Sequence, residues 1–378
     1  MARVVRLAVR SFRNLADGEI ALPEPGLALV GPNGHGKTSF LEALLYLEVF
    51  RSFRGAREKD LARFGADGFR VEAEVDGRQA GASEVGTGGP SDGRPGERAL
   101  TRTVAAGYDA RTRAKRVTVD GLVADRLAGA IGHVRGVVMS PFDVELIVGA
   151  PRERRRYLDV LLALTVAGYL VDLAHYTRAL RQRSRSRGSD LPVWESLMAR
   201  AGSRIAAARR AWAARWAERY RATCVAMGER VEPALAYEPG GPDGAEELEA
   251  ALARGRERDL ATGRTSVGPH RDDLRLTLDG RDLRAFGSAG QQRTAAIALR
   301  VAEAAALAEA RTEPPALCLD DAFAELDAER SDRLGILVSG LLREGSQVFA
   351  TVPRDGEMPE AVKALPRWRI ADGVMGPA

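Results

Sequence analysis

The sequence predicts an α/β fold into which a second, mainly helical lobe is inserted. Three observations support this fold class. Gly31–Thr38 reads GPNGHGKT, a phosphate-binding loop placed between an apolar strand and a segment with helical spacing. Ala316–Asp321 reads ALCLDD, an apolar strand that ends in two carboxylates. From about 151 to 237 the chain is rich in Ala, Leu and Arg, which favours helices. We expect one discontinuous lobe, residues 1–148 plus 262–378, and a helical lobe, residues 149–261.

The N-terminal elements follow from apolar periodicity and turn residues. Residues 3–9 alternate polar and apolar side chains, and residues 27–31 form a short apolar run, so both are expected to be strands around a turn at Pro23–Gly26. Ser39–Glu48, directly after the phosphate-binding loop, has helical spacing. Further strands are expected at Phe69–Val75, Arg116–Asp120 and Val134–Ser140, with a flexible Gly-, Ser- and Pro-rich loop at Gly81–Arg98.

The remaining elements are expected in a regular order. Several helices should cover Pro151–Tyr237, interrupted by a charged break at Arg181–Asp190. Glu238–Gly244 should be a loop, and strand and turn patterns resume at Thr265. The last elements expected are a helix at Thr294–Ala310 and strands at Ala316–Leu319 and Gln347–Val352.

Composition narrows the possible classes of protein. The 378 residues carry a net charge of +4, and their apolar runs are too short to cross a bilayer, so a cytoplasmic protein without membrane contact is expected. Cys224 and Cys318 are too few for a disulfide framework, and the four scattered histidines form no metal-binding pattern. Residues 151–230 hold 17 Arg against 7 Asp and Glu. This surplus fits either a polyanion-binding surface or solvated helix faces.

The phosphate-binding loop predicts the chemistry of the first site. Glycines allow backbone N–H groups to converge on phosphates, and Lys37 is expected to reach the β- and γ-phosphates of ATP. Thr38 is expected to bind Mg²⁺, with Asp320 as the second protein contact of the metal. Asp321 is placed to orient or deprotonate the attacking water. The alternative is that the two carboxylates only cap the next segment.

Gly287–Arg293, which reads GSAGQQR, predicts a second anion site at the start of a helix. Ser288 is expected to cap this helix, and Gly290 permits close backbone approach. Within one chain the phosphate-binding loop already covers one side of the nucleotide, so this site would serve the ATP of a second copy in a two-fold dimer. A plain helix cap is the alternative.

Three other features are candidates for contact with phosphates. The segment Gly136–Asp143 and the strand-end residue Thr351 are each either a γ-phosphate sensor or an ordinary turn position. Arg51 and Arg54 follow the first helix, and they would stabilise charge at the nucleotide, touch DNA phosphates, or lie in a solvated loop.

Taken together, these segments resemble the bacterial RecF recombination-mediator family, relatives of the SMC and ABC-type ATPases. The resemblance runs almost end to end and is most specific in SPFDVELIVGAPRERRRYLD and TSVGPHRDDL. It implies an ABC/SMC-type ATPase head and a helical insertion in place of a coiled coil. It also implies slow ATP hydrolysis, ATP-dependent homodimers, and binding to single-stranded, gapped or junction DNA. RecR and RecO are the implied partners in loading the RecA recombinase.

The resemblance also assigns residues by position. Ser288 and Gln291 become the signature pair, and Glu325–Asp327 would cross the dimer interface. The nucleotide-contacting set is Gly31, Pro32, Asn33, Gly34, His35, Gly36, Lys37, Thr38, Ser288, Gly290 and Gln291. The chain departs from the family pattern at His35, at Ser39 and in a longer Gly81–Arg98 loop. Two other functions stay open: the ATPase subunit of a transporter, and a nucleotide-gated clamp in which Asp321 does not act.

Overall fold

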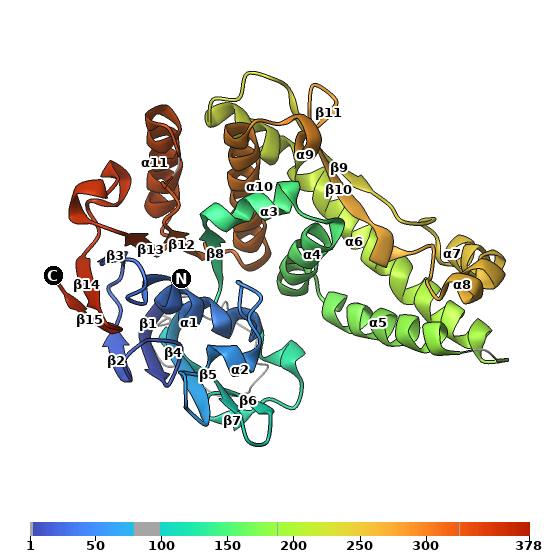
Figure 1. The fold of residues 1–378 in the computed structure, drawn as a ribbon, viewed down its shortest axis with the longest axis horizontal. Coiled ribbons are helices and arrows are strands. Elements are labelled where there is room, and N and C mark those ends of the chain that lie inside the picture. The colour runs from blue at the N-terminus through green and yellow to red at the C-terminus, as the bar shows by residue number, and fades with distance from the viewer. Residues whose placement is uncertain (1–2, 79–98, 187, 325) are drawn as a thin grey trace, which may run out of the picture. The chain divides into compact units, whose positions relative to one another are not determined.

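A computed structural model describes residues 3–78, 99–186, 188–324 and 326–378. The expected loop Gly81–Arg98 lies outside these residues. The chain divides into two compact units, which are described separately below. The first comprises residues 1–140, 312–324 and 334–378, and the second comprises residues 141–311 and 325–333. Figure 1 shows the elements of both units.

The first unit contains a mainly parallel sheet in the strand order β15-β14-β3-β13-β12-β8. Only β15 runs antiparallel to its neighbour. Every residue of β3, β12, β13 and β8 is buried, as expected for parallel strands covered on both faces. The strands are β3 (Gly26–Val30), β8 (Gly136–Met139), β12 (Ala316–Asp320), β13 (Val348–Val352), β14 (Arg367–Ala371) and β15 (Val374–Pro377).

The same unit contains an antiparallel sheet in the order β2-β1-β4-β5-β6-β7. The pairing of β1 with β4 joins segments that lie far apart in the sequence, whereas β4 pairs with β5, the next strand along the chain. Its strands are β1 (Arg3–Arg10), β2 (Gly18–Ala21), β4 (Gly68–Arg78), β5 (Ala99–Asp109), β6 (Ala114–Val119) and β7 (Leu122–Val123).

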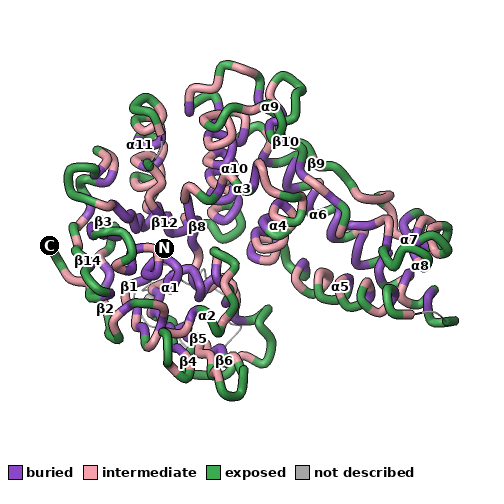
Figure 2. The backbone as a smooth tube through the Cα atoms, viewed as in Figure 1, coloured by how far each residue is buried: buried purple, intermediate pink, exposed green. Residues whose placement is uncertain are grey.

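Helix α1 (Lys37–Val49) packs between these two sheets. It contacts β4 and β5 of the antiparallel sheet and β12 and β13 of the parallel sheet. Its residues from Ser39 to Glu48 are all buried, so the helix has no solvated face (Figure 2). The ring of Phe69 meets Phe12 and Tyr46 edge-on, with centroids 5.3 and 5.4 Å apart. This packing anchors the later turns of α1, the helix that follows the phosphate-binding loop.

Two further helices involve the first unit. Helix α2 (Glu58–Leu61) is short, and α11 (Ala328–Arg343) begins among the residues assigned to the second unit and continues into the first. Helix α11 buries Leu334, Gly335 and Val338 along one side. Within the described residues, no helix is long and apolar enough to cross a membrane.

The second unit is built on the 36-residue helix α6 (Leu191–Ala226), which contacts α5, α7, α10 and β9. Its small antiparallel sheet has the order β11-β10-β9, formed by β9 (Pro233–Glu238), β10 (Asp273–Leu278) and β11 (Arg281–Asp282). The other helices are α3 (Glu145–Val148), α4 (Pro151–Thr165), α5 (Tyr169–Arg185), α7 (Ala245–Arg254), α8 (Arg256–Thr262), α9 (Leu283–Phe286) and α10 (Ala289–Arg311).

Buried arginines join the helices of this unit to the segment that precedes β10. Arg209 of α6 is 2% exposed and donates to Asp272, Asp159 and the carbonyl of Pro269, each at 2.7 Å. Arg154 of α4 pairs with both carboxylate oxygens of Asp273 at 2.7 and 2.8 Å. Buried ion pairs of this kind require both partners, because a lone buried charge is strongly destabilising.

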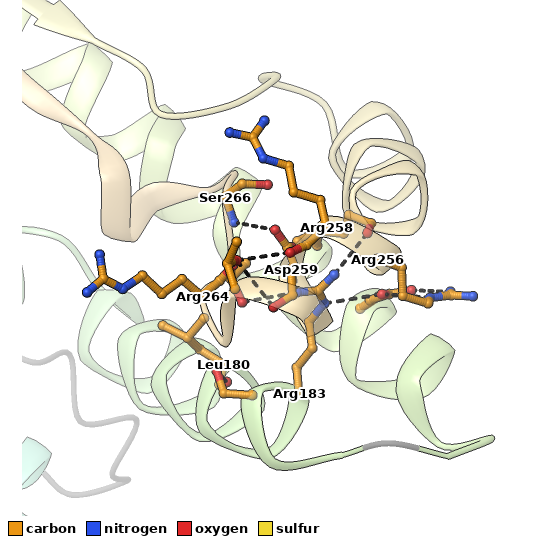
Figure 3. Close-up of polar contacts among 12 residues, drawn as sticks. Leu180, Arg183, Arg256, Arg258, Asp259, Arg264 and Ser266 are labelled. Atoms are coloured by element: carbon orange, nitrogen blue, oxygen red, sulfur yellow. Dashed lines mark hydrogen bonds and ion pairs between the residues drawn. The ribbon is translucent and has the colours of Figure 1, made fainter.

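A second buried network lies where α5, α6 and α8 meet (Figure 3). Arg183 donates to Asp259 at 2.8 Å, to Glu195 at 3.1 Å and to the Thr265 hydroxyl at 3.0 Å. Arg256 also pairs with Glu195. The side chains of Arg258 and Arg264 extend away from this network in Figure 3. The network holds α8 and the start of α6 to the end of α5.

The predicted fold class is confirmed, with local differences. The helical prediction was wrong at residues 233–237, which form β9; this segment alternates buried and exposed side chains and pairs with β10. The charged break begins later than expected, because α5 continues to Arg185. Strand β2 was not expected. Residues 262–311, expected in the first lobe, belong to the second compact unit, where α10 packs on α4 and α6.

Candidate nucleotide-binding site

The loop Gly31–Thr38 connects β3 to α1 and encloses the ammonium of Lys37. The Lys37 Nζ donates to the carbonyls of Gly31 and Pro32 at 2.6 and 3.2 Å and to the Asn33 Oδ1 at 3.1 Å. Gly36 has φ of 110°, in the left-handed region that favours glycine. This conformation turns the chain into α1, whose first N–H groups face the loop. The ammonium and the N–H groups together form a compact positive group suited to phosphate.

Two segments outside the loop fix its conformation. The Asn14 side chain, between β1 and β2, donates to the Gly34 carbonyl at 2.7 Å and accepts from the Ser39 hydroxyl at 2.8 Å. On the other side, the His35 Nδ1 accepts from the Asp372 backbone N–H at 3.0 Å. The side chain of His35, where the chain departs from the family pattern, thus has a structural contact. Neither Asn14 nor Asp372 was predicted, since their loops are adjacent to it only in the folded chain.

Polar side chains from three neighbouring segments meet beside the loop. The Thr38 hydroxyl of α1 donates to the Asp320 Oδ1 at 2.9 Å, at the carboxyl end of β12. The Thr351 hydroxyl, at the end of β13, lies 3.1 Å from the same oxygen and accepts from the Asp321 backbone N–H at 3.0 Å. Asp321 adopts φ of 49°, an uncommon conformation for a residue other than glycine. Such strain occurs frequently at functional sites.

Burial shapes the electrostatics of this cluster. It raises the pKa of Asp320, which is 4% exposed, while hydrogen bonds from Thr38 and Thr351 act in the opposite direction. Burial also lowers the pKa of Lys37, and the Asp321 and Asp320 carboxylates oppose that shift. A cation placed between Thr38 and Asp320 would therefore favour the charged carboxylate. Oxygen ligands of this kind suit Mg²⁺, so the residues fit the expected ATP and Mg²⁺.

The two arginines expected to contact phosphates lie after α1 and differ in their surroundings. Arg54 Nη1 lies 3.9 Å from the Oε2 of Glu42, a fully buried carboxylate on α1. Arg13 also binds Glu42, at 2.9 and 3.0 Å, and the Ser52 hydroxyl donates to it. Arg51 is exposed. Contact with DNA or nucleotide stays a prediction for both arginines, and Glu42 was not anticipated.

Ser288, Gly290 and Gln291 belong to the second unit and form the start of α10. The Gln291 N–H donates to the Ser288 hydroxyl at 3.3 Å, and the Ser288 N–H donates to the Gln291 side chain at 3.0 Å. This reciprocal pair is a capping box, so the expected cap is present. The Gln291 amide also donates to Glu229 at 3.3 Å. Whether the turn binds phosphate of a second chain stays a prediction.

The candidate sensor Gly136–Asp143 consists of β8 and the turn after it. Asp143 Oδ1 accepts from Arg300 of α10 at 2.6 and 3.1 Å. The Arg300 guanidinium also pairs with Glu303 at 2.7 Å and lies over the ring of Tyr157. The acidic end of this segment is therefore bound to α10, the helix that begins at Ser288.

Both cysteines are buried. Among the described residues, no group of three or more His, Cys, Asp and Glu side chains could hold a metal ion by itself. A metal at Thr38 and Asp320 would therefore take further ligands from phosphate oxygens and water, as Mg²⁺ usually does.

Comparisons with known proteins identify relatives of this chain over nearly its full length. The chain is 33% identical to the DNA replication and repair protein RecF of Myxococcus xanthus over 380 residues, covering 96% of this chain and 93% of the relative. It is 35% identical to the RecF of Anaeromyxobacter sp. over 394 residues, covering 99% of both chains. No family model matches the chain.

Solved structures give the same result for the fold. The recombination mediator protein RecF-ATP of the RecFOR pathway superposes with a TM-score of 0.83 and 26% identity, covering 100% of this chain and 98% of the other. An SMC head domain of Pyrococcus furiosus superposes with a TM-score of 0.55 and 16% identity, which supports the fold alone. With relatives above 30% identity matched over nearly their full length, this chain belongs to the RecF family of DNA replication and repair proteins.

Proposed function

We propose that this chain is an ATP-controlled DNA-binding switch of recombinational repair, which binds single-stranded, gapped or junction DNA as an ATP-dependent homodimer. The observation that carries the proposal is the contact of Thr38 with Asp320, because two segments 282 positions apart present a pair of oxygen ligands beside the Lys37 ammonium. Membership of the family and similarity to a RecF-ATP structure support ATP as the nucleotide.

The residues of the site divide the work of phosphoryl transfer. Lys37 and the N–H groups at the start of α1 hold the phosphates, and Thr38 and Asp320 present oxygen ligands to a metal. Asp321 orients the attacking water or accepts its proton. ATP and Mg²⁺ supply the transferable phosphoryl group and neutralise its charge. Thr351 holds the backbone N–H of Asp321 and so sets the direction of its carboxylate.

Hydrolysis is expected to be slow in this switch. The short Asp321 side chain starts from a strained backbone and reaches less far than a glutamate, so it holds the water less closely. Slow turnover suits a protein whose bound state has to persist on DNA. A partnership with RecR and RecO in loading the RecA recombinase is part of this proposal, supported by the similarity to a RecF structure of the RecFOR pathway.

The dimer is the part of the proposal that is easiest to test. The mass of the full chain in solution is measured with and without ATP–Mg²⁺, for wild type, Lys37→Met and Ser288→Arg. Lys37→Met should lose ATP binding and therefore dimerisation. Ser288→Arg should bind ATP as well as wild type but stay monomeric, because the added side chain blocks the turn offered to the second copy.

A matched control variant and a measurement of DNA binding complete the experiment. Ser189→Arg adds the same side chain at an exposed serine of the loop between α5 and α6 and should dimerise like wild type. A gapped duplex should bind only to the ATP-bound dimer, and its affinity should fall steeply with salt. Dimerisation of Ser288→Arg with ATP would reject the cross-chain site. If Asp321→Asn and wild type hydrolyse ATP at the same rate, Asp321 has no catalytic role. The chain would then be a nucleotide-gated clamp without useful turnover.

A further inference from the structure

The first turn of α11 lies against the turn that begins α10. The guanidinium of Arg330 covers Gly290: a Cβ built on Gly290 would lie 3.1 Å from the Arg330 Cζ and Nη1 and 3.3 Å from its Nη2. A side chain at position 290 would therefore displace the guanidinium. Both residues belong to the second unit.

Arg330 is held in this position by Asp327, the residue just before α11. The Arg330 backbone N–H donates to the Asp327 Oδ1 at 2.8 Å, and its Nη1 pairs with the Oδ2 of the same carboxylate. The Arg330 Nε is buried and has no acceptor among the described residues. Hydrogen bonding alone therefore does not explain why the guanidinium lies over Gly290, since a solvated position would satisfy all its donors.

The turn under Arg330 is closed by its own contacts. Ser288 and Gln291 form the capping box, and the Gln291 amide donates to Glu229 beyond the end of α6. The Glu229 Oε1 also accepts from the N–H groups of Arg230 and Val231 at 3.0 and 3.2 Å. The guanidinium therefore rests on a closed, well-bonded turn.

We infer that Arg330 is a positioning residue that fixes Asp327 to the Gly290 turn, so that both segments present one surface to a second copy of this chain. The inference rests on the proposed dimer. Asp327 follows Asp321 by six positions in the sequence, so the fixed segment begins close along the chain to the residue expected to act on water.

A simpler role for Arg330 makes different predictions. Its pair with Asp327 has the i, i+3 spacing that stabilises a helix start, and such pairs contribute little. In that case truncating Arg330 would loosen α11 and leave the Gly290 turn unchanged. Arg333 provides a matched control, because it lies on the same helix and pairs with Glu329 at i, i+4. It donates to the Ala226 carbonyl at 3.1 Å and lies against Gly228 rather than Gly290.

The test compares Arg330→Ala with Arg333→Ala in the full chain. Hydrogen exchange of residues 287–293 is measured on the nucleotide-free monomer, with residues 296–303 of α10 as internal reference. Dimerisation is then measured by titrating each protein in ATP–Mg²⁺, and nucleotide affinity of the monomer is measured separately. Asp327→Ala and the double variant Asp327→Ala, Arg330→Ala complete a double-mutant cycle. Gly290→Ala should reproduce the effect of Arg330→Ala, since the new Cβ displaces the guanidinium.

We expect three results from these variants. Arg330→Ala should raise exchange of the turn about tenfold and weaken ATP-dependent dimerisation about tenfold, with monomer nucleotide affinity unchanged, as expected for a coupling of ordinary size. Arg333→Ala should do neither. The double variant should dimerise no worse than Arg330→Ala, because either change releases the same contact.

Any of three results would overturn the inference. Hydrogen exchange of residues 287–293 could be unchanged in Arg330→Ala, the two arginine variants could have equal effects, or the losses of dimerisation in the double-mutant cycle could be additive. If wild type does not dimerise with ATP, the proposed function fails instead. The exchange measurement still decides whether Arg330 holds the turn, since it is made on the monomer.

Discussion

Thr351→Val removes one hydroxyl from the centre of the candidate site with little change in shape. Thr351 is 5% exposed, and its hydroxyl accepts from the Asp321 N–H at 3.0 Å and lies 3.1 Å from the Asp320 Oδ1. In the valine variant the Asp321 N–H loses its acceptor. A fully buried donor without an acceptor costs about 1–3 kcal/mol, and the half-buried Asp321 N–H should cost an amount near the lower end of that range.

The lost hydrogen bond should change the backbone conformation of Asp321. With φ of 49°, this residue adopts a conformation that costs on the order of 1 kcal/mol more than the common ones. Without the bond to Thr351 the backbone should leave this conformation, and a loss of about 1.4 kcal/mol reduces its population about tenfold. Turnover should fall by the same factor. The affinity for ATP should change little, because Lys37 and the loop are not involved.

Steady-state phosphate release and nucleotide binding are measured separately on both proteins. Thr294→Val is the control, because the Thr294 hydroxyl is also buried but has no partner among the described residues. It should leave turnover unchanged. Wild-type turnover in a stably folded Thr351→Val would refute the idea that Thr351 positions Asp321. An equal fall in ATP affinity would assign Thr351 to binding rather than catalysis.

Three further predictions concern charge. Burial raises the pKa of Asp320, so the affinity for Mg²⁺ should decline on acidification before the exposed carboxylates titrate. A Mg²⁺ titration at several pH values checks this. The variant Asp320→Asn should bind Mg²⁺ weakly at every pH. Burial lowers the pKa of His270, so the unfolded chain binds more protons and stability should fall as pH drops below about 6.5. Urea unfolding at pH 7 and 5.5 checks this, and an equal decline in His270→Gln would contradict it. Arg183→Met should destabilise the chain by about 3–5 kcal/mol, because Asp259 stays buried without its ionic partner and Glu195 keeps only Arg256. The exposed Arg264→Met should cost little, and similar urea midpoints for these two variants would reject the network's role.

The first site was largely predictable because its parts are local in sequence. Gly31–Thr38 carries its own turn chemistry, and Asp320 ends an apolar run that can only be a buried strand. Parallel strands place their carboxyl ends at one edge, so Thr38 and Asp320 were expected near each other, whereas for Thr351 the sequence allows either a γ-phosphate sensor or a turn position. The contacts that hold this edge were not predictable. The loop after β1 brings Asn14 to Gly34, and the turn after β14 brings Asp372 to His35, so both contacts exist only in the folded chain.

In the second unit, the amino-acid composition led to a wrong secondary-structure prediction for one segment. Pro233–Glu238 lies in an Ala-rich stretch with helical composition, yet its alternating side chains pair with β10. Tertiary pairing overrides weak local preference. Asp272 and Asp273 were quoted in the sequence as part of a specific motif, but their partners Arg209 and Arg154 precede them by more than 60 positions. No spacing rule connects residues so far apart.

The arginine surplus of residues 151–230 now has a more definite meaning. Arg154, Arg183 and Arg209 are buried, and each pairs with a carboxylate between residues 259 and 273, outside the counted segment. Arg210 and Arg215 pair with Asp243 and Glu309, which also lie outside it. Five of the 17 arginines are thus neutralised by carboxylates that the sequence count left out, about half of the apparent surplus. A polyanion surface on this unit has to rest on the remaining exposed arginines, and the buried ones hold the helices together.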